Sequence, residues 1–378
     1  MANATGVTEV HGGTAVAVAE RVAAAHSLWL SSLPTIRRAP IGDLLPQLLA
    51  GAELEPLTEP IAAPVVTVAR TLVAGHGPVS DMAVSPDGRH LVTAHYSADV
   101  VCVIDAETLS VTATIDGLRE AYSAVAVGDR AYVSAASDEV DAVIAIDTRT
   151  GKPLAAKTFQ MTAGGLAVSP AGDVLYVART ADDIVDIAAV DVETGDATSI
   201  EILAAPGASV EALSVSADGT RLFAALTTPT GGLLAIIDTG ERTVRDLVAI
   251  GGSIGDIAVM PNGRTVFATG WDAEFGGAVH VIDVAGGRVT DTIEMGGMPT
   301  QLVLSRGGSC AYVVDRDAIA VLCTATFEIV DSVVIGPQLS CLAADPVRNR
   351  LYAADYTGAI TALRLEAAPR QQLAAAAS

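Results

Sequence analysis

The chain has 378 residues, of which 51% are hydrophobic and 17% are charged, so it can bury a large apolar core and is not an intrinsically disordered protein. Its 44 Asp and Glu residues outnumber its 22 Lys and Arg residues, which gives a formal net charge of -22. Phosphate backbones and anionic lipid surfaces repel such a charge, so we expect no nucleic-acid partner and no binding to a membrane surface.

The first residues do not resemble a signal peptide or a membrane span. The opening sequence MANATGVTEV has no basic region, and Glu20, Arg21 and His26 interrupt the apolar stretch that follows. No part of the chain reaches the roughly 18 consecutive apolar residues of a membrane-spanning helix. We therefore expect a cytoplasmic protein without membrane insertion.

Residues 1–64 are expected to form a helical extension followed by a Pro-rich linker. Val18, Val22, Ala25 and Trp29 recur at helical spacing and share one face. A second apolar set follows Asp43 as a helix cap. The apolar face either packs on the domain that follows or binds a protein partner or a second subunit. We favour the second alternative, in which these four residues contact the partner.

Residues 65–366 contain seven related segments, in each of which short apolar runs alternate with Pro-Asp-Gly, Asp-Gly or Asn-Gly turns. Their turns recur about every 40 to 47 residues, at Ser85, Gly128, Ser169, Ser216, Met260, Ser305 and Asp345. This period is typical of a four-stranded propeller blade. The sequence thus predicts an all-β fold, a seven-bladed β-propeller.

A second marker recurs in step with these turns, because a short apolar run ends in Asp105, Asp147, Asp191, Asp238 and Asp283. Such an Asp can accept hydrogen bonds from backbone N–H groups two or three residues later, so we interpret it as an Asx turn and not as a ligand. Cys323 and Arg364 occupy the corresponding positions of the last two repeats.

The last repeat supplies only three strands, around residues 340–345, 350–355 and 359–365. The segment 65–73 resembles the outermost strand of the other repeats and precedes the first one. We expect this segment to complete the last blade and close the ring, which leaves few exposed sheet edges. Residues 367–378 are expected to form a flexible tail.

The repeats SPDGRHLVTA…VVCVIDAETLSVTATI and SPAGDVLYVA…IAAVDVETG resemble the YVTN-type repeat of YncE-like seven-bladed β-propellers, within the lactonase-like propeller superfamily. The resemblance covers residues 65–366 and implies the propeller fold. Members of the wider group include ligand- or DNA-interacting proteins and 6-phosphogluconolactonase-like enzymes. None of their functional motifs matches this chain residue by residue, and one fold supports many functions.

Candidate ligand-binding residues occur in two kinds of loop that meet at the mouth of the central channel, namely the loops between blades and the loops between the two middle strands of a blade. The candidates are His76, His95, Tyr96, Arg119, Glu120, Asp256, Trp271, Asp272, Arg316 and Tyr356. The same loops also contain Tyr122, Glu211 and Gln301.

These residues match no known catalytic or metal-binding spacing. His76, His95 and nearby acids could hold a cation, but no HxH or HExxH spacing occurs, so we expect no metal and no cofactor. Lactone hydrolysis would need a general base and a cation to hold the oxyanion, which Glu120 with Arg119 or Asp256 with His76 could supply. No GxSxG or GxGxxG motif is found in a fitting context, and we expect the Gly pairs to lie in turns.

Cys310 and Cys323 would face each other across a hairpin if Arg316 and Asp317 form its two-residue turn. They are either a redox pair or two buried thiols. For the whole chain, we expect a non-catalytic propeller that mediates protein–protein or small-ligand binding, with no assigned catalytic residue. The alternative is a lactonase-like hydrolase that acts at the channel mouth.

Overall fold

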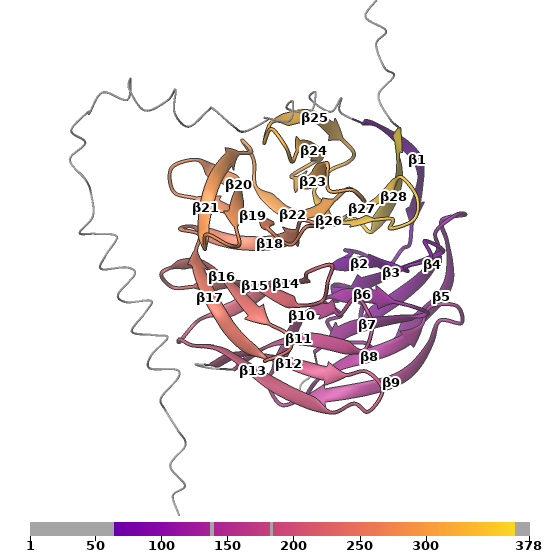
Figure 1. Ribbon diagram of the computed structural model, residues 1–378. Helices are drawn as coiled ribbons and strands as arrows, with labels where there is room; N and C mark the ends of the chain where they lie inside the picture. The colour runs from indigo at the N-terminus through magenta and orange to yellow at the C-terminus, as the bar shows by residue number, and fades with distance from the viewer. Residues whose placement is uncertain (1–63, 137–139, 182–183, 367–378) are drawn as a thin grey trace, which may run out of the picture. The chain divides into compact units, whose positions relative to one another are not determined.

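The computed structural model describes residues 64–136, 140–181 and 184–366. Within them the protein is an all-β seven-bladed propeller, which confirms the predicted fold class (Figure 1). The proposed helical extension with Val18, Val22, Ala25 and Trp29 lies outside the described residues, as does the tail 367–378. The one helical element of the described part is the 3₁₀ turn η2 (Tyr96–Ala98), and no helix there could span a membrane.

Each blade is an antiparallel meander of four strands, numbered from the channel outwards. The strands of blades 1 to 3 are β2 (Asp81–Val84), β3 (His90–His95), β4 (Val100–Asp105) and β5 (Ser110–Asp116); β6 (Ala124–Val127), β7 (Arg130–Ala135), β8 (Asp141–Asp147) and β9 (Lys152–Phe159); β10 (Thr162–Val168), β11 (Val174–Ala181), β12 (Ile184–Asp191) and β13 (Ala197–Ala204). The strands of blades 4 to 6 are β14 (Ser209–Val215), β15 (Arg221–Thr228), β16 (Gly231–Asp238) and β17 (Thr243–Ala249); β18 (Ser253–Val259), β19 (Thr265–Asp272), β20 (Gly276–Asp283) and β21 (Arg288–Glu294); β22 (Pro299–Leu304), β23 (Cys310–Asp315), β24 (Ala318–Cys323) and β25 (Ile329–Val334).

Blade 7 joins the two ends of the propeller chain. It contains β26 (Leu339–Ala344), β27 (Arg350–Asp355), β28 (Ala359–Glu366) and, as its outermost strand, β1 (Val65–Val73). β1 pairs antiparallel with β28 from Val65 opposite Glu366 to Val73 opposite Ala359, and Figure 1 shows the indigo β1 beside the yellow β28. The predicted closure by residues 65–73 is therefore confirmed.

Blade 7 also contacts blade 1 through side chains. The hydroxyl of Tyr352 donates to the carbonyl of Ala106 (3.2 Å), and Arg350 forms an ion pair with Glu107 (3.1 Å). Leu91, Ile104 and Ile360 are fully buried between these two blades. The ring is thus closed by an apolar core as well as by the β1–β28 ladder.

The turns explain why the repeats fold in this way. In the first strand connection of blade 1, Ser85 donates to Asp87 (2.6 Å), and Gly88 has a φ of 68°, a conformation that favours glycine. In the last connection of the blade, Asp105 accepts from the backbone N–H groups of Glu107 (3.1 Å) and Thr108 (2.7 Å). The corresponding bonds at Asp147 and Asp191 confirm the predicted Asx turns.

Candidate binding face and central channel

The innermost strands of the seven blades, β2, β6, β10, β14, β18, β22 and β26, surround a central channel (Figure 1). The channel cavity measures about 500 Å³ and is lined by backbone and side chains of these strands and of the loops before them. Its ionisable lining residues are Asp81, Tyr122, Glu211 and Asp256, without Arg, Lys or His among the described residues. The cavity is therefore acidic.

Asp81 and Asp256 are the two carboxyls held most firmly in this channel. Asp81 accepts from the backbone N–H of Met82 (2.8 Å) and, from blade 2, the N–H of Ala124 (2.9 Å). Asp256 accepts from its own neighbour Ile257 (2.8 Å) and, from blade 6, the N–H of Leu302 (2.9 Å). Each carboxylate thus connects two adjacent blades.

Two uncharged side chains make the same connection in other blades. The Ser123 hydroxyl of blade 2 accepts from the backbone N–H of Leu166 in blade 3 (3.3 Å). The Gln301 side-chain oxygen of blade 6 accepts from the N–H of Leu342 in blade 7. We call Asp81, Ser123, Asp256 and Gln301 the inter-blade latch. In blades 3, 4 and 7, the position four residues before the turn is occupied by Gly165, Ala212 and Cys341. None of these residues has a side-chain amide or carboxylate.

Burial raises the pKa of Asp81 to about 6, although the hydrogen bonds from Ala124, Met82, Ser123 and Gln301 oppose the shift. Burial also raises the pKa of Asp256 to about 7, and the charge of Asp81 adds to this effect. Partial burial, together with the carboxylates of Glu211, Asp81 and Asp256, raises the pKa of Tyr122 above its ordinary value. These shifts show that the four groups share one electrostatic environment.

The channel opens on the face made by the loops between blades and by the loops between the second and third strands, which lie at the same end of an antiparallel meander. We call this the channel-mouth face. Every exposed aromatic side chain of the described residues lies on it: Tyr96, Tyr122, Trp271, Phe275 and Tyr356, which are 41–55% exposed.

Carboxylates dominate the same face. The loops, the strand residues that border them and the channel lining carry Asp81, Asp99, Asp116, Glu120, Asp141, Asp186, Glu211, Asp256, Asp272, Glu274, Glu294, Asp315, Asp317 and Asp355, against Arg119, Arg316 and Arg179, which is paired with Asp186, among the described residues. Arginines are instead frequent at the opposite end of the strands, at Arg89, Arg130, Arg149, Arg221, Arg242, Arg264, Arg288, Arg306, Arg348 and Arg350.

The structure brings the rings of His76 and His95 together, but the contacts of His95 are those of a residue that stabilises the fold. Their rings meet edge to face, with centroids 5.7 Å apart. The His95 ring is buried and is bonded to the Thr93 hydroxyl (2.9 Å) and to the carbonyl of Gly77 (3.3 Å). Burial lowers the pKa of His95 below its ordinary value. His95 is therefore a buried core residue at the end of β3, although the sequence had placed it in a loop.

The other predicted residues lie on the rim and do not converge on one point of the cavity. Tyr96, Arg119, Trp271, Arg316 and Tyr356 are exposed there. Glu120 donates its backbone N–H to Asp99 (3.0 Å). Asp272 closes an Asx turn by accepting from Glu274 (2.7 Å) and Phe275 (3.1 Å). Of the ten candidates, only Asp256 lines the channel cavity.

Sequence reasoning missed Asp81 and Ser123, because neither stands in a motif. It did place Tyr122, Glu211 and Gln301 in the channel-mouth loops, and all three line the cavity. Within the described part of the chain, no group of three His, Cys, Asp or Glu side chains is arranged to hold a metal ion.

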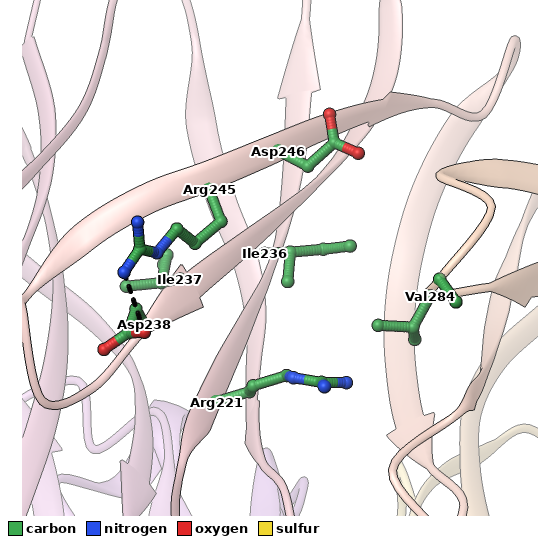
Figure 2. Close-up of a pocket in the computed structure, with 8 residues that line it drawn as sticks. Arg221, Ile236, Ile237, Asp238, Arg245, Asp246 and Val284 are labelled. Atoms are coloured by element: carbon green, nitrogen blue, oxygen red, sulfur yellow. Dashed lines mark hydrogen bonds and ion pairs between the residues drawn. The ribbon is translucent and has the colours of Figure 1, made fainter.

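A second, smaller pocket of about 210 Å³ lies between blades 4 and 5, away from the channel. Figure 2 shows Arg221 below Ile236 and directed toward Val284, and Arg245 forms an ion pair with Asp238 (3.1 Å). Arg221 also donates to the carbonyl of Gly263 in blade 5 (3.2 Å). We interpret this pocket as part of the contact between the two blades.

Comparison with known proteins agrees with this architecture. Residues 67–103 match the family model described as WD domain, G-beta repeat. The chain is 32% identical to the seven-bladed beta-propeller protein Rv1057 of Mycobacterium tuberculosis, over 79% of this chain and 84% of that protein. The chain belongs to this seven-bladed β-propeller family.

A solved structure shares the fold at much lower identity. The propeller resembles a chain of the hydrazine synthase of Kuenenia stuttgartiensis with a TM-score of 0.68 and 19% identity, over 78% of this chain and 97% of that chain. This likeness concerns the fold alone, since unrelated functions occur on the same propeller architecture.

Proposed function

We propose that this protein is a non-catalytic binding propeller whose channel-mouth face takes a Lys- or Arg-rich segment of a protein partner. The observation that carries the proposal is the joint location of all exposed aromatic side chains of the described residues and an excess of carboxylates on this one face. Exposed aromatic residues are enriched in protein interfaces, and they supply most of the binding energy there.

The chemistry of the face fits a basic segment. Lys and Arg side chains bind over the faces of Trp and Tyr rings by cation–π interaction, and carboxylates supply the charge-assisted hydrogen bonds. Trp271 and Tyr356 offer exposed rings at the rim, and Asp272 and Glu274 lie beside Trp271. The acidic cavity behind them has room for one long basic side chain.

A fluorescently labelled Lys/Arg-rich peptide tests this proposal with the full-length protein. We expect saturable binding that weakens with salt, because the contacts are electrostatic. Trp271→Ala and Glu274→Gln should each weaken binding, the tryptophan change by about tenfold, as for an interface hot spot. Leu154→Ala on the outer strand β9 and Glu193→Gln in the β12–β13 turn are matched controls, because both side chains are exposed away from the channel mouth.

Equal binding by Trp271→Ala and by the Leu154→Ala control would refute the proposed face. Equal binding of an acidic peptide of the same length would refute the basic partner.

The lactonase-like hydrolase remains a second candidate, because the pKa values of Asp81 and Asp256 lie near neutrality, where a general base works best. Both carboxyls, however, accept two backbone N–H bonds each, and no basic side chain of the described residues lines the cavity to hold an oxyanion. Lactone hydrolysis by the wild type that is lost in Asp256→Asn, while the fold is kept, would favour the hydrolase.

The proposal includes four further expectations. The repeats are of the YVTN, YncE-like type, the protein acts in the cytoplasm, and it binds no nucleic acid because of its charge of -22. Val18, Val22, Ala25 and Trp29 are proposed to contact a protein partner or a second copy of the chain. Val22→Asp with Trp29→Asp should then dissociate the complex in analytical ultracentrifugation without changing the melting of the propeller.

A further inference from the structure

Cys323 occupies a turn position that Asp holds in five other blades. At Asp105, Asp147 and Asp191, a carboxylate oxygen accepts the backbone N–H bonds of the two residues that lie two and three positions later. In blade 6, the same turn has its closing bond from the N–H of Phe327 to the carbonyl of Cys323 (2.9 Å). The sulfur of Cys323 therefore stands where the other blades place an anionic oxygen.

The turn supplies donors to this sulfur. Burial opposes ionisation of the Cys323 thiol, but hydrogen bonds from the Thr326 hydroxyl and from the backbone N–H groups of Thr326 and Ala325 outweigh it. The pKa of Cys323 consequently lies below its ordinary value. A turn of this kind stabilises an anion, whether it is a carboxylate or a thiolate.

Cys310 lies directly opposite Cys323 in the β23–β24 ladder, as the sequence predicted. The N–H of Thr324 donates to the carbonyl of Ser309 (3.1 Å), next to the cysteine pair. Cys310 itself donates its N–H to the Ser305 hydroxyl and accepts at its carbonyl from the N–H of Ser305, so its backbone does not bond to Cys323. Cys310 and Cys323 are therefore a non-hydrogen-bonded pair, the arrangement in which the side chains of antiparallel strands lie closest. Its usual Cα separation of about 4.5 Å falls within the range of disulfides.

The two cysteines differ in acidity, as a nucleophile and its resolving partner do. Burial raises the pKa of the Cys310 thiol, with a further contribution from Cys323. Both thiols are free and buried, but Cys323 ends its strand at a surface turn. The remaining cysteines, Cys102 and Cys341, lie within strands β4 and β26, and burial raises the pKa of each.

We propose that Cys323 and Cys310 are a peroxide-sensitive dithiol that forms a reversible cross-strand disulfide in blade 6. The Cys323 thiolate attacks hydrogen peroxide, so that an S–O bond forms, the O–O bond breaks, and the departing hydroxide takes up a proton to become water. The Cys310 thiol then attacks the sulfenic acid of Cys323; the S–S bond forms, the S–O bond breaks, and a second water leaves with the Cys310 proton. Two thiols and one peroxide give one disulfide and two waters.

The test is a titration of the reduced full-length protein with hydrogen peroxide, followed by alkylation in denaturant and peptide mass spectrometry. We expect a linked peptide pair that contains Cys310 and Cys323 and is lighter by two hydrogen atoms, while Cys102 and Cys341 remain alkylated. Dithiothreitol should restore both thiols. In the native reduced protein, Cys323 should react with iodoacetamide about tenfold faster than Cys102, because its thiolate is more populated.

Variants separate the role of Cys323 as the nucleophile from that of Cys310 as the resolving thiol. Cys310→Ser should stop at a sulfenic acid on Cys323 that dimedone traps. Cys323→Asp restores the residue of the other blades, so it should fold normally and leave Cys310 reduced after the same treatment. The proposal is overturned if peroxide oxidises Cys102 or Cys341 as fast as Cys323, or if the oxidised wild type contains no Cys310–Cys323 link.

Discussion

Asp256 in blade 5 accepts a hydrogen bond from the backbone N–H of Leu302 in blade 6, with 2.9 Å between its Oδ2 and the nitrogen. The other carboxylate oxygen accepts from Ile257 within its own blade (2.8 Å). One side chain therefore joins the innermost strands of two blades at the point where both face the channel. Asp81 makes the equivalent connection from blade 1 to blade 2.

Asp256→Ala should lower the free energy of unfolding by about 1–3 kcal/mol at pH 5, because the variant leaves the N–H of Leu302 without its partner in a half-buried site. Urea unfolding followed by circular dichroism measures the change. Asp291→Ala, an exposed residue of the outer strand β21, is the matched control and should change stability by less than about 0.5 kcal/mol. A similar loss in both variants would contradict the latch.

The same carboxyls predict a pH dependence with a definite sign. The pKa values of Asp81 and Asp256 in the folded state, about 6 and about 7, lie above the value of 3.8 expected for the unfolded chain. The folded state thus binds more protons between these values. Protonation of Asp81 and Asp256 therefore contributes fully to the free energy of unfolding below about pH 3.8. This contribution is lost as the pH rises through 6 and 7.

Carboxyl groups in the turns change the stability with pH in the opposite direction, so their contribution must be separated from that of Asp81 and Asp256. Hydrogen bonds from Ser216 and Thr220 lower the pKa of Asp218 to about 2, so its contribution is present above pH 4 and disappears on acidification. We therefore compare the wild type with the double variant Asp81→Asn, Asp256→Asn. The free energy of unfolding of the wild type should fall relative to that of the variant as the pH rises from 5 to 8. Denaturant titrations across this range measure it, and a difference independent of pH would contradict the shifted pKa values.

The strand β1 gives a prediction about closure. A chain that begins at residue 64 should melt cooperatively, whereas a chain that begins at residue 74 lacks β1 and exposes the edge of β28. We expect the shorter chain to melt many degrees lower or to aggregate, measured by differential scanning calorimetry and light scattering. Equal melting temperatures for the two chains would show that β1 is dispensable for closure.

The sequence was sufficient for the fold because its signals are periodic. Seven turns at a regular spacing define seven blades, and Cys310 opposite Cys323 follows from a two-residue turn. The inter-blade latch could not be derived in the same way. The contact of Asp81 with Ala124 depends on how two blades pack, and Asp81 in the segment DMAV differs in no local feature from a surface Asp.

The candidate site was only partly predictable for a related reason. Polar residues in turns identify the channel-mouth loops, but they do not separate a side chain that closes its own turn, such as Asp272, from one that faces the cavity, such as Glu211. His95 illustrates the same limit, since its neighbours Tyr96 and Asp99 suggest a loop while the register of β3 with β4 buries its ring.

The last prediction concerns Gly252, which lies in the loop between β17 and β18 beside the exposed Trp271. A Cβ atom at this position would overlap the backbone carbonyl oxygen of Trp271 and crowd the backbone of Asp272. These neighbours are backbone atoms of an adjacent strand, so they cannot move aside as a flexible side chain would. Gly252 has no left-handed φ, so glycine is required there by the close approach of two chain segments and not by the turn conformation.

Gly252→Ala should displace the end of β19 and with it the ring of Trp271, so we expect weaker binding of the basic peptide and a melting temperature lower by several degrees. Gly164→Ala is the matched control, because a Cβ there meets no atom within 4 Å and its backbone φ is not in the left-handed region. Tryptophan fluorescence of Trp29→Phe versions of both variants isolates the signal of Trp271. An unchanged emission spectrum in the Gly252→Ala protein, with unchanged peptide affinity, would contradict the link between this glycine and the channel-mouth face.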